Sequence, residues 1–462
     1  MILLPNLERK RKAWQDGVAH ATLDPEGPGA ARMHLVPPKP VFFGDPPSQL
    51  IINGTWFLPV GPSWAAVLRI FFEELHVRCR DKYEISPEEI EQIEKAVVSR
   101  TLKLYPGTDP VMISGDLKEI VTLAVSIATN GEIPEGTLNG LDIEKYSKYM
   151  TAPHRMDLMV APMTVNGMRA CPLECACCYA ESGSVMDIGE PLSTDDWKLI
   201  IDKCRDAGIP MLTFTGGEPL TRRDIAVLVR YASWFVTRVN TNAFLLTPEL
   251  ACELRDASLD GIQITLYSHD PGIHDELVGK EGAWEKTVAG IKNAVAAGLE
   301  ASINTPLLDK NRDLESTIRF AYSLGIRCFG CSSLIPTGGA VEQINTGKAL
   351  TPAELKDILK KAVEVCNELK SDISFTSPGW LSAEEIAELG LPSSPVCGAC
   401  LSNMAVAPGG DVVPCQSWVS GQTLGNIRTQ TWKSIWNGKA CRNIRRNCAA
   451  RPKCALKEGN VI

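Results

Sequence analysis

The sequence predicts an α/β protein in three parts: an α+β module, a partial (β/α)6 barrel and a small cysteine-rich domain. Strand-like and helix-like segments alternate between residues 155 and 345, which is typical of a parallel sheet covered by helices. Residues 49–150 instead show a strand pair followed by helices, and residues 396–462 are rich in cysteine. Six alternating units suit an open, TIM-like barrel better than a closed eightfold one.

The alternating region begins with an apolar strand at residues 156–163, and Ser193 caps the helix that follows. Further strands are expected at 211–214, 238–242, 261–267, 300–306 and 328–335. Helices are expected at 193–207, 223–234, 248–257, 284–297 and 314–324. In such a sheet, ligands bind at the carboxyl ends of the strands, where the loops begin.

The region before the barrel divides into two parts. Residues 1–48 are rich in proline and glycine, and we expect an irregular arm there. A strand pair at 50–60 and helices beginning at Ser63 and Ser86 form a module over residues 49–150. This module is either a structural cap on the barrel or an element that recognises a peptide by strand addition.

The composition is that of a soluble globular protein, with 44% hydrophobic and 22% charged residues. A net charge of −8 disfavours a general nucleic-acid binder. No apolar stretch approaches the roughly 20 residues of a membrane-spanning helix, and the apolar run at residues 1–4 is too short for a signal peptide. We therefore expect a cytoplasmic protein without membrane or nucleic-acid partners. Clustered cysteines in that compartment indicate metal binding or catalysis.

Four cysteines lie together directly after the first strand: Cys171, Cys175, Cys177 and Cys178. Thiolates are soft ligands that suit zinc or iron–sulfur clusters. The C-x3-C-x2-C spacing of Cys171, Cys175 and Cys178 would hold three irons of a cubane and leave the fourth free for a substrate. The alternative is a zinc site with all four cysteines as ligands, which the adjacency of Cys177 and Cys178 makes awkward.

The second strand ends in the run Gly216-Gly217-Glu218. Paired glycines let a ligand approach the backbone closely, and a carboxylate offers a partner for an ammonium group. This turn, one βα unit after C-x3-C-x2-C, resembles the radical S-adenosylmethionine (radical SAM) enzymes. The resemblance covers residues 155–340 and extends to the motifs at residues 240–242, 262–268 and 282–286.

The resemblance implies a cofactor set and the residues that bind it. Cys171, Cys175 and Cys178 would ligate a [4Fe–4S] cluster, whose open iron takes the amino and carboxylate groups of S-adenosylmethionine. The Gly216-Gly217-Glu218 turn would receive the ammonium group. Carboxylate or ribose contacts are implied for Asn242, Thr265, Lys286 and Asn304; the alternative for these is a strand-end polar residue or an exposed helix cation. Family members usually place an apolar residue where this chain has Cys177, which therefore either packs as a small apolar side chain or is a spare thiol.

Residues 346–395 are expected to form a bridge, built on an amphipathic helix at 351–370, to a C-terminal domain at 396–462. This domain resembles the SPASM and twitch auxiliary-cluster domains, and residues 405–412 predict a hairpin within it. The spacing departs from the full SPASM pattern after Cys415. We expect one complete auxiliary [4Fe–4S] cluster, with two incomplete clusters or a structural zinc site as alternatives. Its candidate ligands are Cys397, Cys400, Cys415, Cys441, Cys448 and Cys454.

The resemblance implies an enzyme that reductively cleaves S-adenosylmethionine to a 5′-deoxyadenosyl radical. The substrate is expected to be a peptide or protein that is crosslinked, epimerised or oxidised, and the electron donor a flavodoxin or ferredoxin. One alternative is a small-molecule substrate such as a sugar, nucleotide or tetrapyrrole. Another is a non-enzymatic iron–sulfur or zinc protein. Cys328 and Cys331, on the sixth strand, are candidate hydrogen-atom donors or simply buried strand cysteines.

Overall fold

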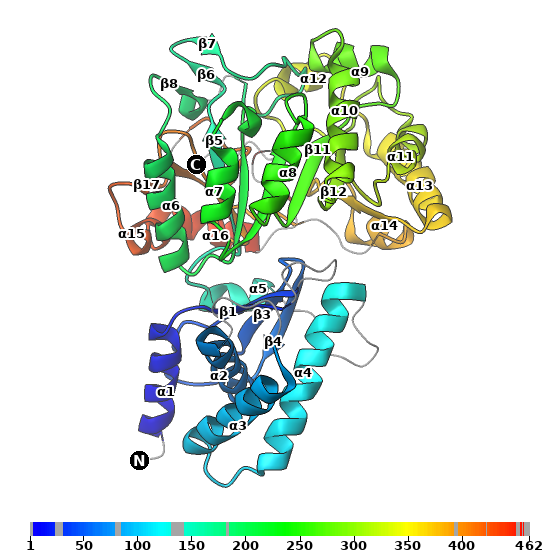
Figure 1. The fold of residues 1–462 in the computed structure, drawn as a ribbon. Coiled ribbons are helices and arrows are strands. Elements are labelled where there is room, and N and C mark those ends of the chain that lie inside the picture. The colour runs from blue at the N-terminus through cyan, green and yellow to red at the C-terminus, as the bar shows by residue number, and fades with distance from the viewer. Residues whose placement is uncertain are drawn as a thin grey trace. The chain divides into compact units, whose positions relative to one another are not determined.

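The structure is a computed structural model of the chain (Figure 1). It describes residues 3–23, 31–78, 85–130, 143–181, 184–391, 396–421, 423–449, 453–454 and 456. The chain divides into two compact units, Met1–Thr151 and Ala152–Ile462. No helix among these described residues is both long and apolar enough to cross a membrane.

The first unit is an antiparallel four-stranded sheet packed against helices. Its strands are β1 (Ala19–Leu23), β2 (Ala31–Val36), β3 (Ser48–Ile52) and β4 (Trp56–Val60). Its helices are α1 (Leu3–Gln15), α2 (Pro62–Arg78), α3 (Pro87–Leu104), α4 (Pro110–Asn130) and α5 (Ile143–Tyr146). The sheet order β1-β2-β3-β4 makes β1 and β4 its edges.

The expectation of an irregular arm at residues 1–48 is wrong, because this segment contains α1, β1 and β2. Met33 and Leu35 alternate on β2 and are buried in the core of the unit, together with Ala21 of β1. This short period-2 pattern ties the chain into the sheet despite the prolines and glycines around it.

The second unit is built on a parallel sheet with covering helices, as predicted (Figure 1). The parallel strands are β5 (Arg155–Ala161), β9 (Met211–Gly216), β10 (Val236–Thr241), β11 (Gly261–Thr265), β12 (Ala301–Pro306), β13 (Cys328–Ser332) and β14 (Asp372–Phe375). The helices between them are α6 (Thr194–Asp206), α7 (Ile225–Tyr231), α8 (Pro248–Asp256), α9 (Pro271–Val278), α10 (Ala283–Ala296), α11 (Leu314–Ser323), α12 (Ala340–Asn345) and α13 (Pro352–Leu369). The sheet does not close on itself, so the prediction of a partial barrel is confirmed.

Two features of this sheet differ from the prediction. The region expected only as a bridge contributes a seventh strand, β14, which pairs in parallel with β13 and buries Ile373 and Phe375. The predicted C-terminal hairpin forms as β15 (Asn403–Val406) and β16 (Asp411–Val413), and β15 pairs in parallel with β5. The cysteine-rich end is therefore continuous with the barrel sheet rather than a separate layer.

The remaining elements are short. A small sheet holds β6 (Thr164–Val165), β7 (Met168–Arg169) and β8 (Asp187–Ile188). The C-terminal part also contains α14 (Ala383–Glu388), β17 (Gly425–Asn426), α15 (Trp432–Trp436) and α16 (Lys439–Ala449).

Candidate active site at the carboxyl ends of the strands

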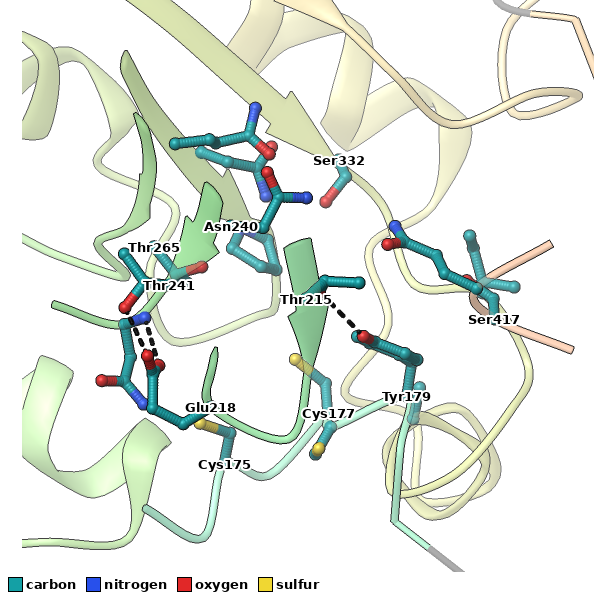
Figure 2. Close-up of a pocket in the computed structure, with 18 of the residues that line it drawn as sticks. Cys175, Cys177, Tyr179, Thr215, Glu218, Asn240, Thr241, Thr265, Ser332 and Ser417 are labelled. Carbon is teal, nitrogen blue, oxygen red and sulfur yellow. Dashed lines mark hydrogen bonds between the residues drawn. The ribbon is translucent and has the colours of Figure 1, made fainter. Parts of the chain in front are cut away.

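A pocket of about 430 Å³ opens at the carboxyl ends of the barrel strands (Figure 2). This volume lies within the ordinary range of ligand sites. Its wall brings together nearly all the residues predicted for the first cluster and for S-adenosylmethionine. These are Cys171, Cys175, Cys178, Gly216, Gly217, Glu218, Asn242, Thr265 and Asn304.

The cysteine loop at residues 171–178 is held by main-chain hydrogen bonds from two other segments. Glu174 N–H donates to Val278 O (2.8 Å) at the end of α9. On the other side, Gly339 N–H donates to Cys178 O (2.9 Å). Gly338 has a φ of +55°, and a Cβ there would stand 2.2 Å from Cys178 O. Only glycine fits this close approach, so the backbone itself clamps the loop.

The glycine turn after β9 packs directly on the chain that leaves β5. Gly216 has a φ of +130°, and an added Cβ would lie 2.1 Å from Ala161 O. At Gly217 the nearest atom would be Pro162 O, at 2.6 Å. The two glycines therefore bring two strand ends together and leave bare backbone in the pocket wall.

Glu218 is buried, and its carboxylate is almost fully used inside the chain. Its oxygens accept hydrogen bonds from Thr241 Oγ1 (2.6 Å) and Asn242 N (2.9 Å) (Figure 2) and from Leu220 N (2.9 Å). Burial raises the pKa of Glu218, and these three hydrogen bonds oppose that rise. A carboxylate has about four acceptor positions, so little capacity is left for a ligand ammonium. The geometry makes Glu218 a brace between the ends of β9 and β10.

Two tyrosines connect the cysteine loop to the strand ends. Tyr179 Oη donates to Gly216 O at 3.0 Å and lies 3.3 Å from Thr215 Oγ1 (Figure 2). Tyr267 Oη lies 3.2 Å from Cys177 Sγ. Cys177 thus lines the pocket and has a polar partner, rather than packing as a purely apolar side chain. The sequence analysis did not name these two tyrosines. Tyr179 directly follows Cys178, and Tyr267 follows the fourth strand, so proximity to these motifs was the signal that could have identified them.

Burial disfavours the charged form of the loop thiols. Burial raises the pKa of Cys171 to about 12 and that of Cys177 to about 11, and it raises the pKa of Cys175 well above its ordinary value. Bound cations reverse this logic, since metal-coordinating thiols lose their protons. A group of buried thiols that faces an open pocket therefore fits an iron–sulfur cluster.

The four polar residues predicted to contact S-adenosylmethionine have different fates. Thr265 and Asn304 line the pocket. Asn242 also lines it, but its side-chain oxygen accepts a hydrogen bond from Phe244 N (2.9 Å). Lys286 lies on the exposed face of α10, outside the pocket wall. The implied contact for Lys286 stays a prediction, which its position outside the pocket wall does not support.

Neither candidate hydrogen-atom donor belongs to the pocket wall. Cys331 is fully buried, and its Sγ donates to Ser374 O (3.6 Å) of the neighbouring strand. Cys328 is exposed at the amino end of β13, 3.9 Å from Asp372 Oδ2. Cys331 thus fits the alternative of a buried strand cysteine, and Cys328 lies at the end of its strand opposite the pocket, so neither position supports a role as hydrogen-atom donor.

Polar atoms without partners among the described residues point to a ligand in the pocket. Asn240 Oδ1, Ser333 Oγ and Gln416 Oε1 are buried in its wall without a hydrogen bond. His274 Nδ1 accepts from Tyr267 N (3.3 Å), and burial lowers its pKa to about 4. The neutral ring therefore carries its proton on Nε2, which has no acceptor. Buried polar groups normally form hydrogen bonds, so these atoms can form hydrogen bonds with a molecule bound in the pocket.

The tail cysteines also gather, although they come from separate segments. Cys448 Sγ lies 3.4 Å from Cys397 Sγ, and Cys454 is hydrogen-bonded to the same Cys397 side chain. Cys400 and Cys441 are hydrogen-bonded free thiols, and this hydrogen bond, with the nearby Arg445 guanidinium, lowers the pKa of Cys441. Burial raises the pKa of Cys415 to about 12, with Cys397 adding to the rise. These contacts bring the thiols together, but in the described ranges no group of three or more His, Cys, Asp or Glu side chains has an arrangement that could hold a single metal ion.

Comparison with known proteins identifies a family for the barrel region and for the cysteine-rich end. Residues 165–321 match the model of the radical SAM superfamily, and residues 397–456 match SPASM, an iron–sulfur cluster-binding domain. A Streptococcus suis structure, SuiB bound to its precursor peptide SuiA, has a similar fold. It gives a TM-score of 0.58 at 15% identity and covers 86% of this chain and 87% of its own.

Two kinds of curated protein are similar in sequence. An AdoMet-dependent heme synthase of Methanosarcina barkeri is 31% identical over 305 residues, 62% of this chain and 85% of its own. A PqqA peptide cyclase of Bradyrhizobium diazoefficiens is 26% identical over 284 residues, 59% of this chain and 72% of its own. The chain belongs to the radical SAM superfamily of enzymes, which use a [4Fe–4S] cluster and S-adenosylmethionine, and it carries a SPASM domain for auxiliary iron–sulfur clusters.

Proposed function

We propose that Cys171, Cys175 and Cys178 hold the radical-forming [4Fe–4S] cluster. When bound, this cluster supplies the electron that cleaves S-adenosylmethionine to a 5′-deoxyadenosyl radical. The supporting observation is that these three thiols share one pocket with the Gly216-Gly217 turn. The bare backbone of the turn offers main-chain groups to the methionine end of the cofactor.

In this proposal, the chain's own residues mainly fix positions. Glu218 joins the turn after β9 to the end of β10, and Tyr179 joins the cysteine loop to the same turn. These links keep the loop and the turn in register, as a reaction that tolerates little misplacement requires. Thr265 and Asn304 remain free to contact the ribose or the carboxylate.

For the substrate, we propose a peptide. The first unit contains an antiparallel sheet whose edge strands are β1 and β4, and addition of a strand to a sheet edge is a general mode of peptide binding. SuiB, whose fold is similar over 86% of this chain, was captured with a precursor peptide. PqqA peptide cyclases are among the sequence relatives. Together these favour ribosomally made peptides that are crosslinked, epimerised or oxidised.

A tetrapyrrole is the second candidate, and a specific observation favours it. Three AdoMet-dependent heme synthases match with identities of 31%, 28% and 27%. Each match leaves more than a third of this chain outside it. A tetrapyrrole substrate would give the first unit no peptide to bind.

The test is an anaerobic assay of the full chain with reconstituted clusters, S-adenosylmethionine and dithionite. We expect 5′-deoxyadenosine, and its absence would refute the radical function. Peptides encoded by short reading frames beside the gene and a carboxylated porphyrin precursor are then added separately. A mass change in a peptide supports the first candidate, whereas a change only in the porphyrin replaces it with the second.

A further inference from the structure

The chain is acidic overall, but one stretch near its end has the opposite charge. Residues 412–457 contain no Asp or Glu, although the whole chain carries a net charge of −8. The basic residues of this stretch are Arg428, Lys433, Lys439, Arg442, Arg445, Arg446, Arg451, Lys453 and Lys457. Such segregation of charge creates a local positive potential on an otherwise negative molecule.

Helix α16 carries some of these basic residues and two of the tail cysteines on different sides. Its buried side carries Cys441, Ile444 and Cys448. Lys439, Arg442 and Arg446 follow a three- and four-residue spacing on its exposed side, and we call these three the basic face. A helix is about 10–12 Å across with its side chains. The basic face is thus one helix diameter from two of the thiols predicted to hold the auxiliary cluster.

Two nearby arginines have structural roles, because each contacts another side chain of the fold. Arg428 pairs with Asp196 at 2.9 Å, and the Arg445 guanidinium lies 3.8 Å from the centre of the Trp436 ring. The three residues of the basic face form no ion pair with any residue that the structure describes. Like charges three and four residues apart destabilise a helix by about 0.2–0.5 kcal/mol per pair. The fold gains nothing from this arrangement, which instead suits an external partner.

We propose that the basic face docks an acidic one-electron carrier protein of the flavodoxin or ferredoxin class. This inference rests on the proposed function, because each reductive cleavage consumes one electron. In the transfer, the reduced flavin or iron–sulfur centre of the carrier would lose one electron, and an auxiliary cluster held by the tail cysteines would gain it. No covalent bond forms or breaks, and no proton is transferred. Redox partners meet through small, transient interfaces, and complementary charge speeds their encounter.

The test compares two charge-reversed full-length proteins. One carries Lys439→Glu, Arg442→Glu and Arg446→Glu. The matched control carries Lys292→Glu, Lys360→Glu and Lys361→Glu, which change the net charge equally on exposed positions of α10 and α13. Iron content and circular dichroism establish that both proteins fold and carry their clusters.

The first readout is the binding of oxidised flavodoxin at low and high salt, which needs no turnover. We expect the basic-face variant to bind about tenfold or more weakly at low salt and the control to bind like the parent. High salt should remove the difference, because it screens exposed charges. Equal binding by both variants, or binding of anionic vesicles or duplex RNA in place of flavodoxin, would overturn the proposal.

The second readout is 5′-deoxyadenosine formation with two reductants. Reduced flavodoxin should drive the basic-face variant about tenfold or more slowly than the control, while dithionite should drive all proteins equally. Equal rates with flavodoxin would refute the docking face. A parent protein that gives no product even with dithionite would instead refute the proposed function, so the two failures are distinguishable.

Discussion

The two groups of cysteines are assembled in opposite ways. Cys171, Cys175 and Cys178 lie on one short loop, which the backbone of residues 277–279 and 338–339 clamps from outside. The tail cysteines come from a loop, the end of β16, one face of α16 and the segment beyond it. A local loop keeps its ligand spacing in the sequence, whereas ligands gathered from several elements depend on how those elements pack.

The largest expected effect follows from Cys175→Ala. If the loop holds the radical-forming cluster, removal of one of its three ligands should reduce 5′-deoxyadenosine formation to background, even with dithionite as reductant. Cys252→Ala, on α8 and outside both groups, is the control and should leave the rate unchanged. Substantial activity in the Cys175 variant would place the cluster elsewhere.

Cys441→Ala should separate the second group from the first. We expect the bound iron to fall by about half, if one four-iron cluster is lost and one is kept. Cleavage of S-adenosylmethionine with dithionite should survive, because the cysteine loop does not depend on α16. Iron analysis beside the dithionite assay checks both parts, and unchanged iron would remove Cys441 from the ligand set.

Gly338→Ala should weaken the clamp on the cysteine loop. An added Cβ would stand 2.2 Å from Cys178 O at a φ of +55°, and overpacking of this kind costs about 1–3 kcal/mol. Gly347→Ala is the matched control, since its φ is +75° but no atom lies within 4 Å of the added Cβ. Thermal unfolding should show a lower Tm for Gly338→Ala than for the control. Equal Tm values would mean that the loop yields without cost.

Cys177→Ser should have the smallest effect. The serine hydroxyl keeps a hydrogen-bonding group near Tyr267 Oη, the present partner of Cys177. Iron content and S-adenosylmethionine cleavage should therefore stay close to those of the parent. A loss of iron comparable with that of Cys175→Ala would show that Cys177, rather than Cys178, is the third ligand.

The sequence predicted the barrel well because its signals are local. The parallel strands β5, β9, β10, β11, β12 and β13 all overlap segments expected to be strands, and Ser193 caps its helix as expected. The four-residue strand β14 was missed because so short a run gives almost no periodic signal. β1 and β2 were missed because prolines and glycines flank them.

The candidate site likewise contains features that local sequence signals predict and features that depend on packing. The cysteine spacing and the double glycine were sufficient to predict that Cys171, Cys178 and Gly216 belong to one site, and all three line the same pocket. The bracing role of Glu218 was not predictable, because its partners come from the next strand along. The exposed position of Lys286 outside the pocket wall was not predictable, because sequence order does not say which side of a helix faces a pocket. The positions of His274 Nε2 and Gln416 Oε1, which have no hydrogen-bond partner among the described residues, depend on packing that sequence spacing does not reveal.

The pairing of β5 with β15 has a consequence for how the protein is made. Arg155 opens the barrel sheet and Asn403 lies beside it, so the first barrel strand gains this neighbour only late in synthesis. Until then the nascent chain exposes an apolar parallel edge, which is a site for mispairing. Contacts so distant along the chain form slowly. A chain whose synthesis stops before residue 403 should therefore form an aggregation-prone intermediate. Only a chain that includes the cysteine-rich tail can cover the edge of β5.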